Sequence, residues 1–281
     1  MTAPGSLYVV ATPLGNLEDV TLRALRVLKE VNWIAAEDTR VTRKFLHHYG
    51  IGTPLTRYDD WTEREKAPRL IQRLLAGESG ALVSDAGTPG LSDPGFHLVR
   101  SAWAAGVKVV PVPGPSAVIA ALSAAGLPAN RFVFEGFLPP RAVERRARLA
   151  ELADEHRTVV FFETARRLRA TLEDMVPIWN DRTIVIAREL TKKFEEFLRG
   201  SARALLSQLA ARPQPLRGEL TVIAEGTSAR AQRRSAASSE WQQTLAQLCA
   251  QGMSLRDAAR RVAQQYGLSR REVYQFGLRR S

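Results

Sequence analysis

The chain has 281 residues, 45% of them hydrophobic, which is enough for two domains with buried cores. Its formal net charge of +11 at pH 7 favours a polyanionic partner, either nucleic acid or an acidic membrane surface. The single cysteine, Cys249, excludes a disulfide framework and a cysteine-based metal site, and it suits a reducing cytoplasm.

The first predicted elements alternate between strand and helix. Residues 7–12 read as a strand ending in Pro-Leu-Gly-Asn, and residues 17–31 carry leucines at helical spacing. A second strand, 33–36, ends at Glu37-Asp38-Thr39-Arg40, which places two carboxylates and a cation at a strand end. This tetrapeptide is either a solvated helix start capped by Asp38 or part of a chemical site.

A loop rich in glycine and proline lies near the middle of the first half. The apolar run 81–83 stops at Ser84-Asp85, and the following ten residues include Gly87, Gly90, Gly95 and two prolines. Glycine lets a backbone pass close to a ligand, and open α/β sheets build a crevice where strands run into such loops. The stretch 81–95 is therefore either a surface turn or a ligand site.

The third predicted loop of this kind follows the strand 107–112. It reads Pro-Gly-Pro-Ser-Ala over residues 113–117 and opens a helix that stops at Gly126-Leu127-Pro128. In a parallel sheet, loops that follow strands gather along one edge, so three of them predict a shared small-molecule site. We expect an α/β domain with a mostly parallel sheet over residues 1–128.

A second α/β domain is predicted over residues 129–226, with five strands and about three helices. Strands are placed at 131–137, 158–162, 183–187 and 218–225, and a helix at 143–155. The arginines 141, 145, 146 and 148 on or beside that helix form either a solvated face or the edge of an anion-binding surface.

The basic charge is concentrated at the C-terminus. Residues 228–281 carry ten arginines and three acidic residues, a net charge of +7. Residues 227–239 are predicted to be a flexible basic linker. Residues 240–281 are predicted to be a basic helical domain, in which helices with serine caps flank a Gly267 turn. This pattern is that of a helix-turn-helix that binds RNA or of an ordinary helical hairpin.

Several chemistries find no support in the sequence. No G-x-G-x-x-G follows a strand, no Walker A loop or H-E-x-x-H is present, and the four histidines lack metal-ligand spacing, so no metal is expected. No secretory signal is visible in residues 1–6. Residues 109–130 are uncharged, but four prolines interrupt them, so no membrane span is predicted. A metal-free, redox-free group transfer fits these absences.

Six ordered motifs besides Ser84–Pro89 (SDAGTP) give the chain a family resemblance. They are ATPLGNL at 11–17, AAEDTR at 35–40, PGPSA at 113–117, EGFLP at 135–139, ARELTK at 187–192 and GE at 218–219. With them, the chain resembles the ribosomal RNA small-subunit methyltransferase I family of the tetrapyrrole methylase superfamily. The resemblance implies two α/β domains with a cleft between them and S-adenosylmethionine as cofactor. It also implies 2′-O-methylation of a cytidine ribose in the decoding region of 16S rRNA, in the small ribosomal subunit, by a cytoplasmic homodimer.

The resemblance also assigns roles to residues. The cofactor is expected to contact the three Gly/Pro loops and two apolar residues of the second domain: Pro13, Asp85, Gly87, Thr88, Ser116, Ala117, Phe162 and Leu190. RNA phosphates are expected to contact basic side chains at Arg40, Lys193, Arg256, Arg260, Arg261, Arg270 and Arg271. The family commonly has a histidine where this chain has Arg166, and an arginine cannot act as a base.

Methyl transfer to a ribose hydroxyl asks mainly for alignment, with a base to accept the proton. Asp38 and Glu37 are the first candidates for that base and Lys192 is the second. Three other functions stay open: a methylase of the same superfamily acting on a tetrapyrrole or a diphthamide precursor, a non-catalytic nucleic-acid-binding protein that senses a ligand, and a basic structural protein.

Overall fold

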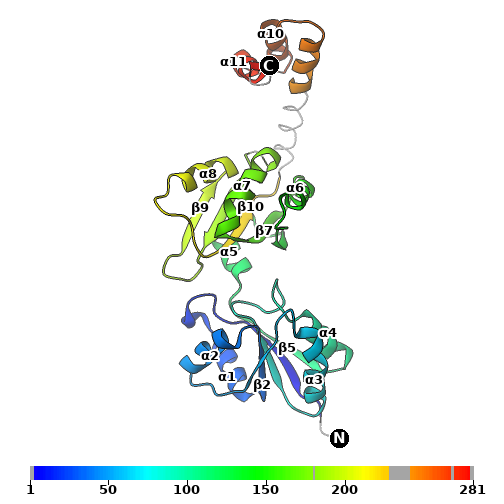
Figure 1. Ribbon diagram of the computed structural model, residues 1–281, viewed down its shortest axis with the longest axis vertical. Coiled ribbons are helices and arrows are strands. Elements are labelled where there is room, and N and C mark those ends of the chain that lie inside the picture. Colours follow the sequence, from blue (N-terminus) through cyan, green and yellow to red (C-terminus); the bar gives the residue numbers. More distant parts are fainter. Residues whose placement is uncertain (1–2, 180, 228–240, 267–268, 279–281) are drawn as a thin grey trace. The chain divides into compact units, whose positions relative to one another are not determined.

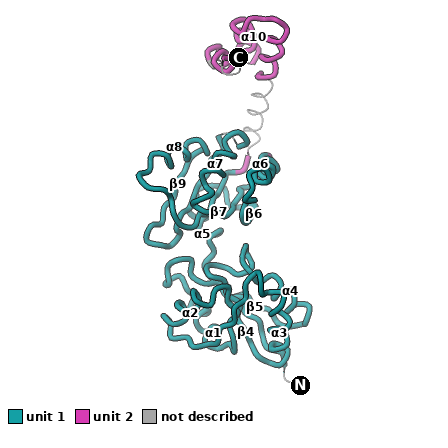
Figure 2. Tube along the Cα trace, in the orientation of Figure 1, with its two compact units in different colours: residues 1–153, 157–225 teal, residues 154–156, 226–281 magenta. Residues whose placement is uncertain are grey.

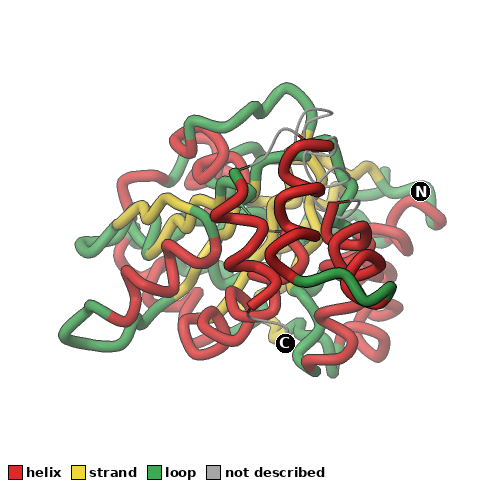
Figure 3. The backbone as a smooth tube through the Cα atoms, turned by 90° about the horizontal axis from the view of Figure 1, so that it is seen from above, coloured by secondary structure: helices red, strands yellow, loops and turns green. Residues whose placement is uncertain are grey.

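The computed structural model describes residues 3–179, 181–227, 241–266 and 269–278 (Figure 1). It divides into two units, one of Met1–Ala153 and Arg157–Glu225, the other of Asp154–His156 and Gly226–Ser281 (Figure 2). The predicted linker lies outside the described residues, apart from Thr227. Helices, strands and loops are distinguished by colour in Figure 3.

The first unit contains two five-stranded sheets. We call the part of the chain up to β5 the first lobe. Its strands are β1 (Ser6–Val10), β2 (Trp33–Ala36), β3 (Leu55–Arg57), β4 (Gly80–Val83) and β5 (Lys108–Val112). Its helices are a short 3₁₀ helix (Leu17–Asp19), α1 (Leu22–Glu30), α2 (Thr39–His48), α3 (Glu63–Leu75) and α4 (Phe96–Ala104).

All strand pairs in the first sheet are parallel, in the order β3-β2-β4-β1-β5, as the sequence predicts. Each of β2 and β4 is buried at every residue, which explains their continuous apolar sequences. One core packs α1 and α2 against the sheet, and a second packs α3 and α4 against it. With helices on both faces, only the strand ends are left to form a site.

The second lobe carries a mixed sheet in the order β6-β7-β10-β8-β9. Its strands are β6 (Phe132–Phe137), β7 (Thr158–Thr164), β8 (Ile184–Arg188), β9 (Glu196–Gly200) and β10 (Glu219–Ala224). Its helices are α6 (Ala142–Glu151), α7 (Ala165–Trp179) and α8 (Ala202–Ala210). Only β6 and β7 are parallel, and β10 pairs antiparallel with both neighbours.

The two faces of the second sheet are covered by helices of different origin. The helices α6, α7 and α8 pack on one face, around residues such as Phe161 and Leu172. The other face is covered by α5 (Ala117–Ala125), the helix that follows β5, through Val118, Ala121 and Leu122. As predicted, α5 ends at Gly126, which has φ +62. The last helix of the first half thus belongs to the core of the second lobe.

Three local predictions for this unit need correction. No strand is predicted at β9, because its five residues, EFLRG, neither alternate between apolar and polar nor form an apolar run, and none of them is buried. The sequence Thr62-Glu63-Arg64-Glu65 predicts a capping box, but Thr62 makes no side-chain cap on α3. Instead, Asp59 Oδ1 accepts hydrogen bonds from the Thr62 amide and hydroxyl. Two of the arginines near α6 form neither a solvated face nor an anion site, because Arg145 pairs with Asp174 at 2.7 Å and Arg148 with Glu135 at 2.6 Å.

The second unit is a small helical bundle. A helix over residues 241–250 precedes α10 (Leu255–Tyr266) and α11 (Arg270–Leu278). The sequence predicts an apolar stripe of Leu255, Ala258, Ala259 and Val262 on α10. Ala258, Ala259 and Val262 are buried, together with Val273 from α11. Ser254 caps α10, as predicted, by accepting a hydrogen bond from the Asp257 amide at 3.2 Å. The predicted turn at Gly267-Leu268 lies outside the described residues.

Candidate functional site

The loops that follow β1 and β4 are hydrogen-bonded to each other. Thr12 and Gly87 form an isolated antiparallel bridge, with N–H to O distances of 2.8 and 3.0 Å. The Thr12 hydroxyl also donates to the Ser84 carbonyl at 3.2 Å. Gly87 has φ +79, and a Cβ added there would lie 3.1 Å from the Leu14 side chain, so both the conformation and the space favour glycine.

The loop after β5 joins the same group. The Thr88 hydroxyl donates a hydrogen bond to the Pro115 carbonyl at 3.1 Å. The three Gly/Pro loops therefore meet at one edge of the first sheet, as their common strand direction predicts. This edge is the carboxyl end of the sheet, where α/β proteins bind ligands.

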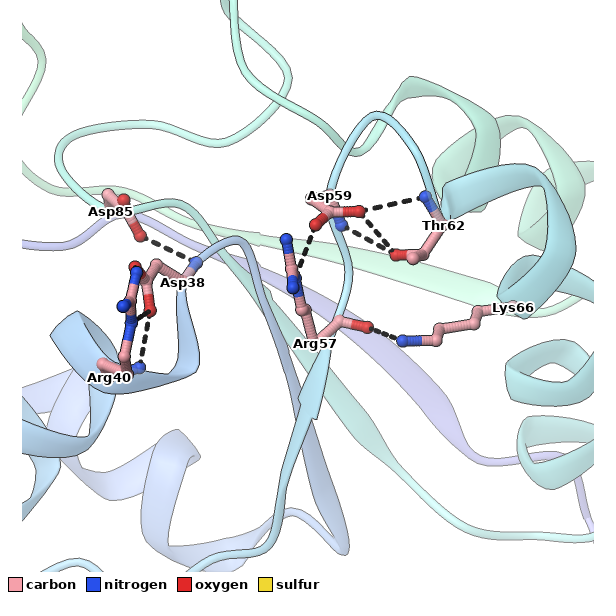
Figure 4. Close-up of polar contacts among 7 residues, drawn as sticks. All are labelled: Asp38, Arg40, Arg57, Asp59, Thr62, Lys66 and Asp85. Atoms are coloured by element: carbon pink, nitrogen blue, oxygen red, sulfur yellow. Dashed lines mark hydrogen bonds and ion pairs between the residues drawn. The ribbon is translucent and has the colours of Figure 1, made fainter.

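The ends of β2 and β4 are tied together by a reciprocal pair of hydrogen bonds. The Asp38 amide donates to Asp85 Oδ1 at 2.9 Å (Figure 4). The Asp85 amide donates to Glu37 Oε2 at 3.3 Å. Each acidic loop thus orients the other. This arrangement fixes the Glu37 carboxyl group beside the Gly/Pro loops.

A cavity of about 330 Å³ opens at this edge, and its walls come from both lobes. The volume is in the range of sites that bury a small molecule. From the first lobe and α5 it is lined by Leu14, Glu37, Asp85, Ala86, Gly87, Thr88, Leu91, Asp93, Ser116, Ala117 and Val118. From the second lobe it is lined by Phe137, Phe162, Glu163, Thr164, Ala187, Leu190, Gly218, Glu219, Leu220 and Thr221.

The charge of this lining is one-sided. Its described residues include five carboxyl side chains and neither lysine nor arginine. Burial, followed by the charges of Asp85 and Asp60, raises the pKa of Asp93 to about 6, although a hydrogen bond with Ser84 lowers it. A cavity with carboxylates and an apolar wall fits a ligand that combines a positive charge with an aromatic group.

Glu37 is a second carboxyl group of the cavity whose pKa lies far above its ordinary value. Burial raises the pKa of Glu37 to about 7, against the hydrogen bond from the Asp85 amide, and repulsion from Asp93, Asp85 and Asp60 adds to the rise. A carboxyl group with this pKa accepts a proton near neutral pH, which is the property that a general base needs.

Asp38 lies beside Glu37 and has a different environment. Its carboxylate caps α2 by accepting from the Arg40 amide at 2.8 Å and pairs with the Arg40 guanidinium at 2.6 Å. These hydrogen bonds hold the pKa of Asp38 well below its usual range, which makes it a weak base. The Arg40 side chain is 85% exposed and remains accessible on its outer side.

Lys192 stands at the rim of the cavity and connects the two lobes. Its Nζ donates to Glu189 at 3.0 Å and to Glu219 at 2.9 Å, and a Cβ added to Gly15 would lie 2.2 Å from its Cγ. Burial alone would lower the pKa of Lys192, but the two carboxylates outweigh it and raise the pKa. A lysine that holds its proton this firmly is a poor base at neutral pH.

The remaining predicted residues fall in three places. Of those assigned to the cofactor, all except Pro13 line the cavity, and the neighbour of Pro13, Leu14, does so. Lys193 is exposed, with its Nζ 5.7 Å from the Phe194 ring centroid. Arg166 is exposed in the first turn of α7. Arginines 256, 260, 261, 270 and 271 are exposed on the second unit, and Arg260 pairs with Asp257 at 3.4 Å.

Several lining residues were not predicted from the sequence. Asp93 belongs to the central loop, but no spacing rule distinguishes it from the loop's other polar residues. Glu163 is buried, and its carboxylate accepts from the Thr171 hydroxyl at 2.7 Å and from the Thr164 amide at 2.8 Å. Phe137 and Gly218–Glu219 lie in two of the motifs that carry the family resemblance, and these motifs are the sequence signal that points to them.

Metal-ligand clusters and membrane-spanning helices are both missing from the part of the chain that the structure describes. Among these residues no group of three or more His, Cys, Asp or Glu side chains is placed to hold a metal ion. In the same residues, no helix combines the length and the apolar character that crossing a bilayer requires.

Comparison with family models gives the class to which this fold and cavity belong. Residues 6–206 match the model for Tetrapyrrole (Corrin/Porphyrin) Methylases. Residues 235–281 match the model for the RsmI C-terminal HTH domain. The first match covers most of the unit that carries the cavity.

Curated relatives narrow the assignment. The "Ribosomal RNA small subunit methyltransferase I" of Pseudomonas aeruginosa is 47% identical over 98% of both chains. The protein of the same name from Xylella fastidiosa is 52% identical over 81% of this chain and 84% of its own. That of Escherichia coli O157:H7 is 44% identical over 98% of this chain and 95% of its own. The chain therefore belongs to the ribosomal RNA small subunit methyltransferase I family of the tetrapyrrole methylases.

Solved structures share the fold at lower identity. The methyltransferase CobJ aligns with a TM-score of 0.60 at 22% identity, covering 79% of this chain and 95% of its own. Diphthine synthase aligns with a TM-score of 0.57 at 16% identity, covering 79% and 90%. Uroporphyrin-III C-methyltransferase from Thermus thermophilus, in a complex with S-adenosyl homocysteine, aligns with a TM-score of 0.53 at 19% identity. The alignment covers 78% of this chain and 97% of that protein's own. These likenesses show a common fold.

Proposed function

We propose that the protein methylates the 2′-hydroxyl of a cytidine ribose in the decoding region of 16S rRNA, with S-adenosylmethionine as methyl donor. The curated relatives carry the name of a ribosomal RNA methyltransferase and match the chain over nearly its whole length. The cavity supports the cofactor, because its carboxylates suit a sulfonium cation and its Phe162 and Leu190 wall suits an adenine ring. Bound there, S-adenosylmethionine supplies an activated methyl group.

The chain's own residues would then align and deprotonate the acceptor. In the displacement, the bond from the ribose oxygen to the methyl carbon forms as the sulfur–methyl bond breaks. The leaving sulfur is neutral, so no acid is required. We assign the ribose proton to Glu37, because this carboxyl group lines the cavity, is held by the Asp85 amide and has a pKa raised to about 7. Asp85 is a positioning residue, since its amide holds the Glu37 carboxylate at 3.3 Å.

The second unit is proposed to bind the RNA backbone. Its five exposed arginines at 256, 260, 261, 270 and 271 are available to phosphates, as are Arg40 and Lys193 on the first unit. Replacing the five with glutamine in the full chain should weaken binding to small subunits. It should also flatten the dependence of log K on log salt by about 0.7–0.9 for each phosphate that is no longer neutralised. An unchanged slope would exclude these arginines from the RNA interface.

The deciding experiment follows the labelled methyl group. Donor labelled in its methyl group is incubated with the protein and with small ribosomal subunits or a free porphyrinoid, and the modified nucleotide is located by sequencing. Label in a cytidine ribose of 16S rRNA is expected. Label in the porphyrinoid would favour the tetrapyrrole alternative, and donor binding without transfer would favour a ligand sensor. A cytoplasmic homodimer is part of the same proposal, and native mass measurement tests the dimer.

A further inference from the structure

Two large aromatic side chains stand exposed at the sheet edge that carries the cavity, although the cavity uses neither. Trp61, in the loop after β3, is 91% exposed, and Phe96, the first residue of α4, is 61% exposed. Both follow the carboxyl ends of parallel strands, β3 and β4. An indole this exposed gains little from folding, and its ring faces are available to a partner.

The Trp61 loop is held in one conformation. Asp59 Oδ1 accepts from the Thr62 amide at 2.9 Å and from its hydroxyl at 2.8 Å, and Arg57 pairs with the same carboxylate. Lys66 Nζ donates to the Arg57 carbonyl at 2.7 Å (Figure 4). These contacts close the loop on both sides of Trp61. The indole is therefore presented from a rigid support, which lowers the entropy cost of binding a flat ligand.

The Trp61 loop lies next to the strand end that carries Glu37, the proposed general base. Ala36 of β2 pairs with Arg57 of β3, so Glu37 and Tyr58 leave the sheet side by side. The charge of Asp60 acts on both Glu37 and Asp93, which line the cavity. The loop also meets the start of α4, where His97 Nε2 lies 3.5 Å from Glu63 Oε1. The segments that carry Trp61 and Phe96 thus meet at the edge of the sheet from which Glu37 and Asp93 reach the cavity.

Cations accompany both aromatic rings. The Arg57 side chain, four residues before Trp61, is 64% exposed, and Arg64 is exposed three residues after Trp61. The Arg100 guanidinium lies 6.0 Å from the Phe96 ring centroid. Aromatic faces interleaved with arginines are the combination that binds unpaired nucleotides, because rings stack on bases and guanidinium groups meet phosphates.

We propose that Trp61 and Phe96 form an aromatic platform on which unpaired rRNA bases next to the target nucleotide stack. The inference rests on the proposed function and adds a positioning role to it. A ribose inside a structured RNA reaches a cavity only if its strand leaves the helical stack. The platform replaces the stacking that the flanking bases then lose.

The test compares Trp61→Ala with Trp103→Ala. Trp103 is 68% exposed near the other end of α4, at the opposite edge of the sheet, and serves as the matched control. Both variants should keep the wild-type melting temperature and the wild-type Kd for S-adenosylhomocysteine. Trp61→Ala should weaken the Kd for an unpaired RNA oligonucleotide, and lower kcat/KM on small subunits, by about 5- to 150-fold. Trp61→Phe should recover most of the loss, and Trp103→Ala should match wild type.

The outcomes separate this inference from the proposed function. Equal RNA Kd values for wild type and Trp61→Ala would overturn the platform. A changed native mass with unchanged RNA binding would also overturn it, and would assign the surface to a second copy of the chain. If the wild-type protein transferred no methyl group to rRNA, the proposed function would be wrong, while the RNA Kd would still decide whether the platform exists.

Discussion

The two sheets of the first unit contribute differently to one cavity. The first is parallel throughout, and its strands end in loops that bring Glu37, Asp85 and Asp93 to the cavity. The second is mixed and contributes aromatic and aliphatic side chains such as Phe162 and Leu190. In a parallel sheet all carboxyl ends share an edge, so polar groups gather there. In a mixed sheet strand ends alternate between edges.

This difference predicts a division of labour. The first sheet places Glu37 and Asp93, whose pKa values are raised toward neutral pH. The second lobe supplies the aromatic rings of the lining and two further carboxyl groups, Glu163 and Glu219. The pair of Arg145 with Asp174 in the second lobe lies outside the lining of the cavity and holds α6 and α7 together. Changes in the first sheet should therefore alter the rate, and changes in the second lobe should alter affinity or stability.

The largest effect is expected for Glu37→Gln. The amide keeps the shape of the side chain but cannot accept the ribose proton, so kcat should fall by about 10²–10⁴-fold. The Kd for S-adenosylhomocysteine should change little. In wild type, kcat/KM should rise with pH through about 7, as Glu37 loses its proton, and this rise should disappear in the variant. A persistent rise would assign the base elsewhere.

Glu37→Gln should also change how the stability of the fold depends on pH. Because the folded state raises the pKa of Glu37 above its ordinary value, the protonated carboxyl stabilises the fold at low pH. That stability is lost as pH rises through about 7. The glutamine side chain of Glu37→Gln does not ionise, so this variant keeps the same stability over that pH range. Its melting temperature, relative to wild type, should therefore be higher at pH 8 than at pH 5.

The second largest effect is expected for Arg145→Met in the second lobe. Arg145 is 5% exposed, and its removal leaves the Asp174 carboxylate with only the longer ion pair of 3.3 Å to Arg146. The free energy of unfolding in urea should fall by roughly 3 kcal/mol. Arg146→Met, at a half-exposed site, should cost less than about 1 kcal/mol. Loss of cofactor affinity in either folded variant would contradict the division.

A smaller effect is expected for Phe162→Ala. The ring lines the cavity and packs against Phe134 at a centroid distance of 5.1 Å and Phe137 at 5.5 Å. Its removal should raise the Kd for S-adenosylhomocysteine by about tenfold, or about 1.4 kcal/mol, at nearly unchanged kcat. Phe134→Leu, next to the ring but outside the lining, is the control and should have a weaker effect. A large fall in kcat at saturating cofactor would contradict the claim that the second lobe affects affinity and not rate.

The smallest effect is expected for Asp38→Asn. Asparagine also caps a helix, so α2 should remain intact. The Asp38 carboxylate is already ionised throughout the working pH range because of Arg40. The pH–rate profile should therefore match wild type within about twofold, a change worth about 0.4 kcal/mol. A shifted profile would return Asp38 to the role that we give to Glu37.

Much of the fold follows from local patterns that the sequence displays. Buried parallel strands such as β2 and β4 are apolar throughout, and the loops after β1, β4 and β5 carry glycine and proline, so their meeting at one edge was predictable. The edge strand β9 was not, because none of its five residues is buried and its sequence, EFLRG, has neither an apolar run nor a strand-like alternation. Local periodicity also could not show that α5 covers the second sheet.

The sequence predicts the backbone conformation of the site better than it predicts the pKa values of the carboxyl groups there. Glycine at 87 follows from φ and space, and both can be guessed from a tight loop. The contrast between Glu37 and Asp38 could not be guessed, because the two are neighbours in sequence and differ only in tertiary surroundings. One is half-buried among carboxylates, and the other is neutralised by Arg40 two residues on.

The position of α5 determines where this protein can be joined to part of another protein in a chimera. Its apolar face, with Val118 and Leu122, is fitted to the sheet that begins after residue 131, yet it is joined directly to Ser116 and Ala117 at the cavity. A chimera that receives the second half of another tetrapyrrole methylase should be spliced before residue 113. A junction at the Gly126–Pro128 stop, although it is the more obvious seam in the sequence, would place a foreign sheet under a helix shaped for the original one.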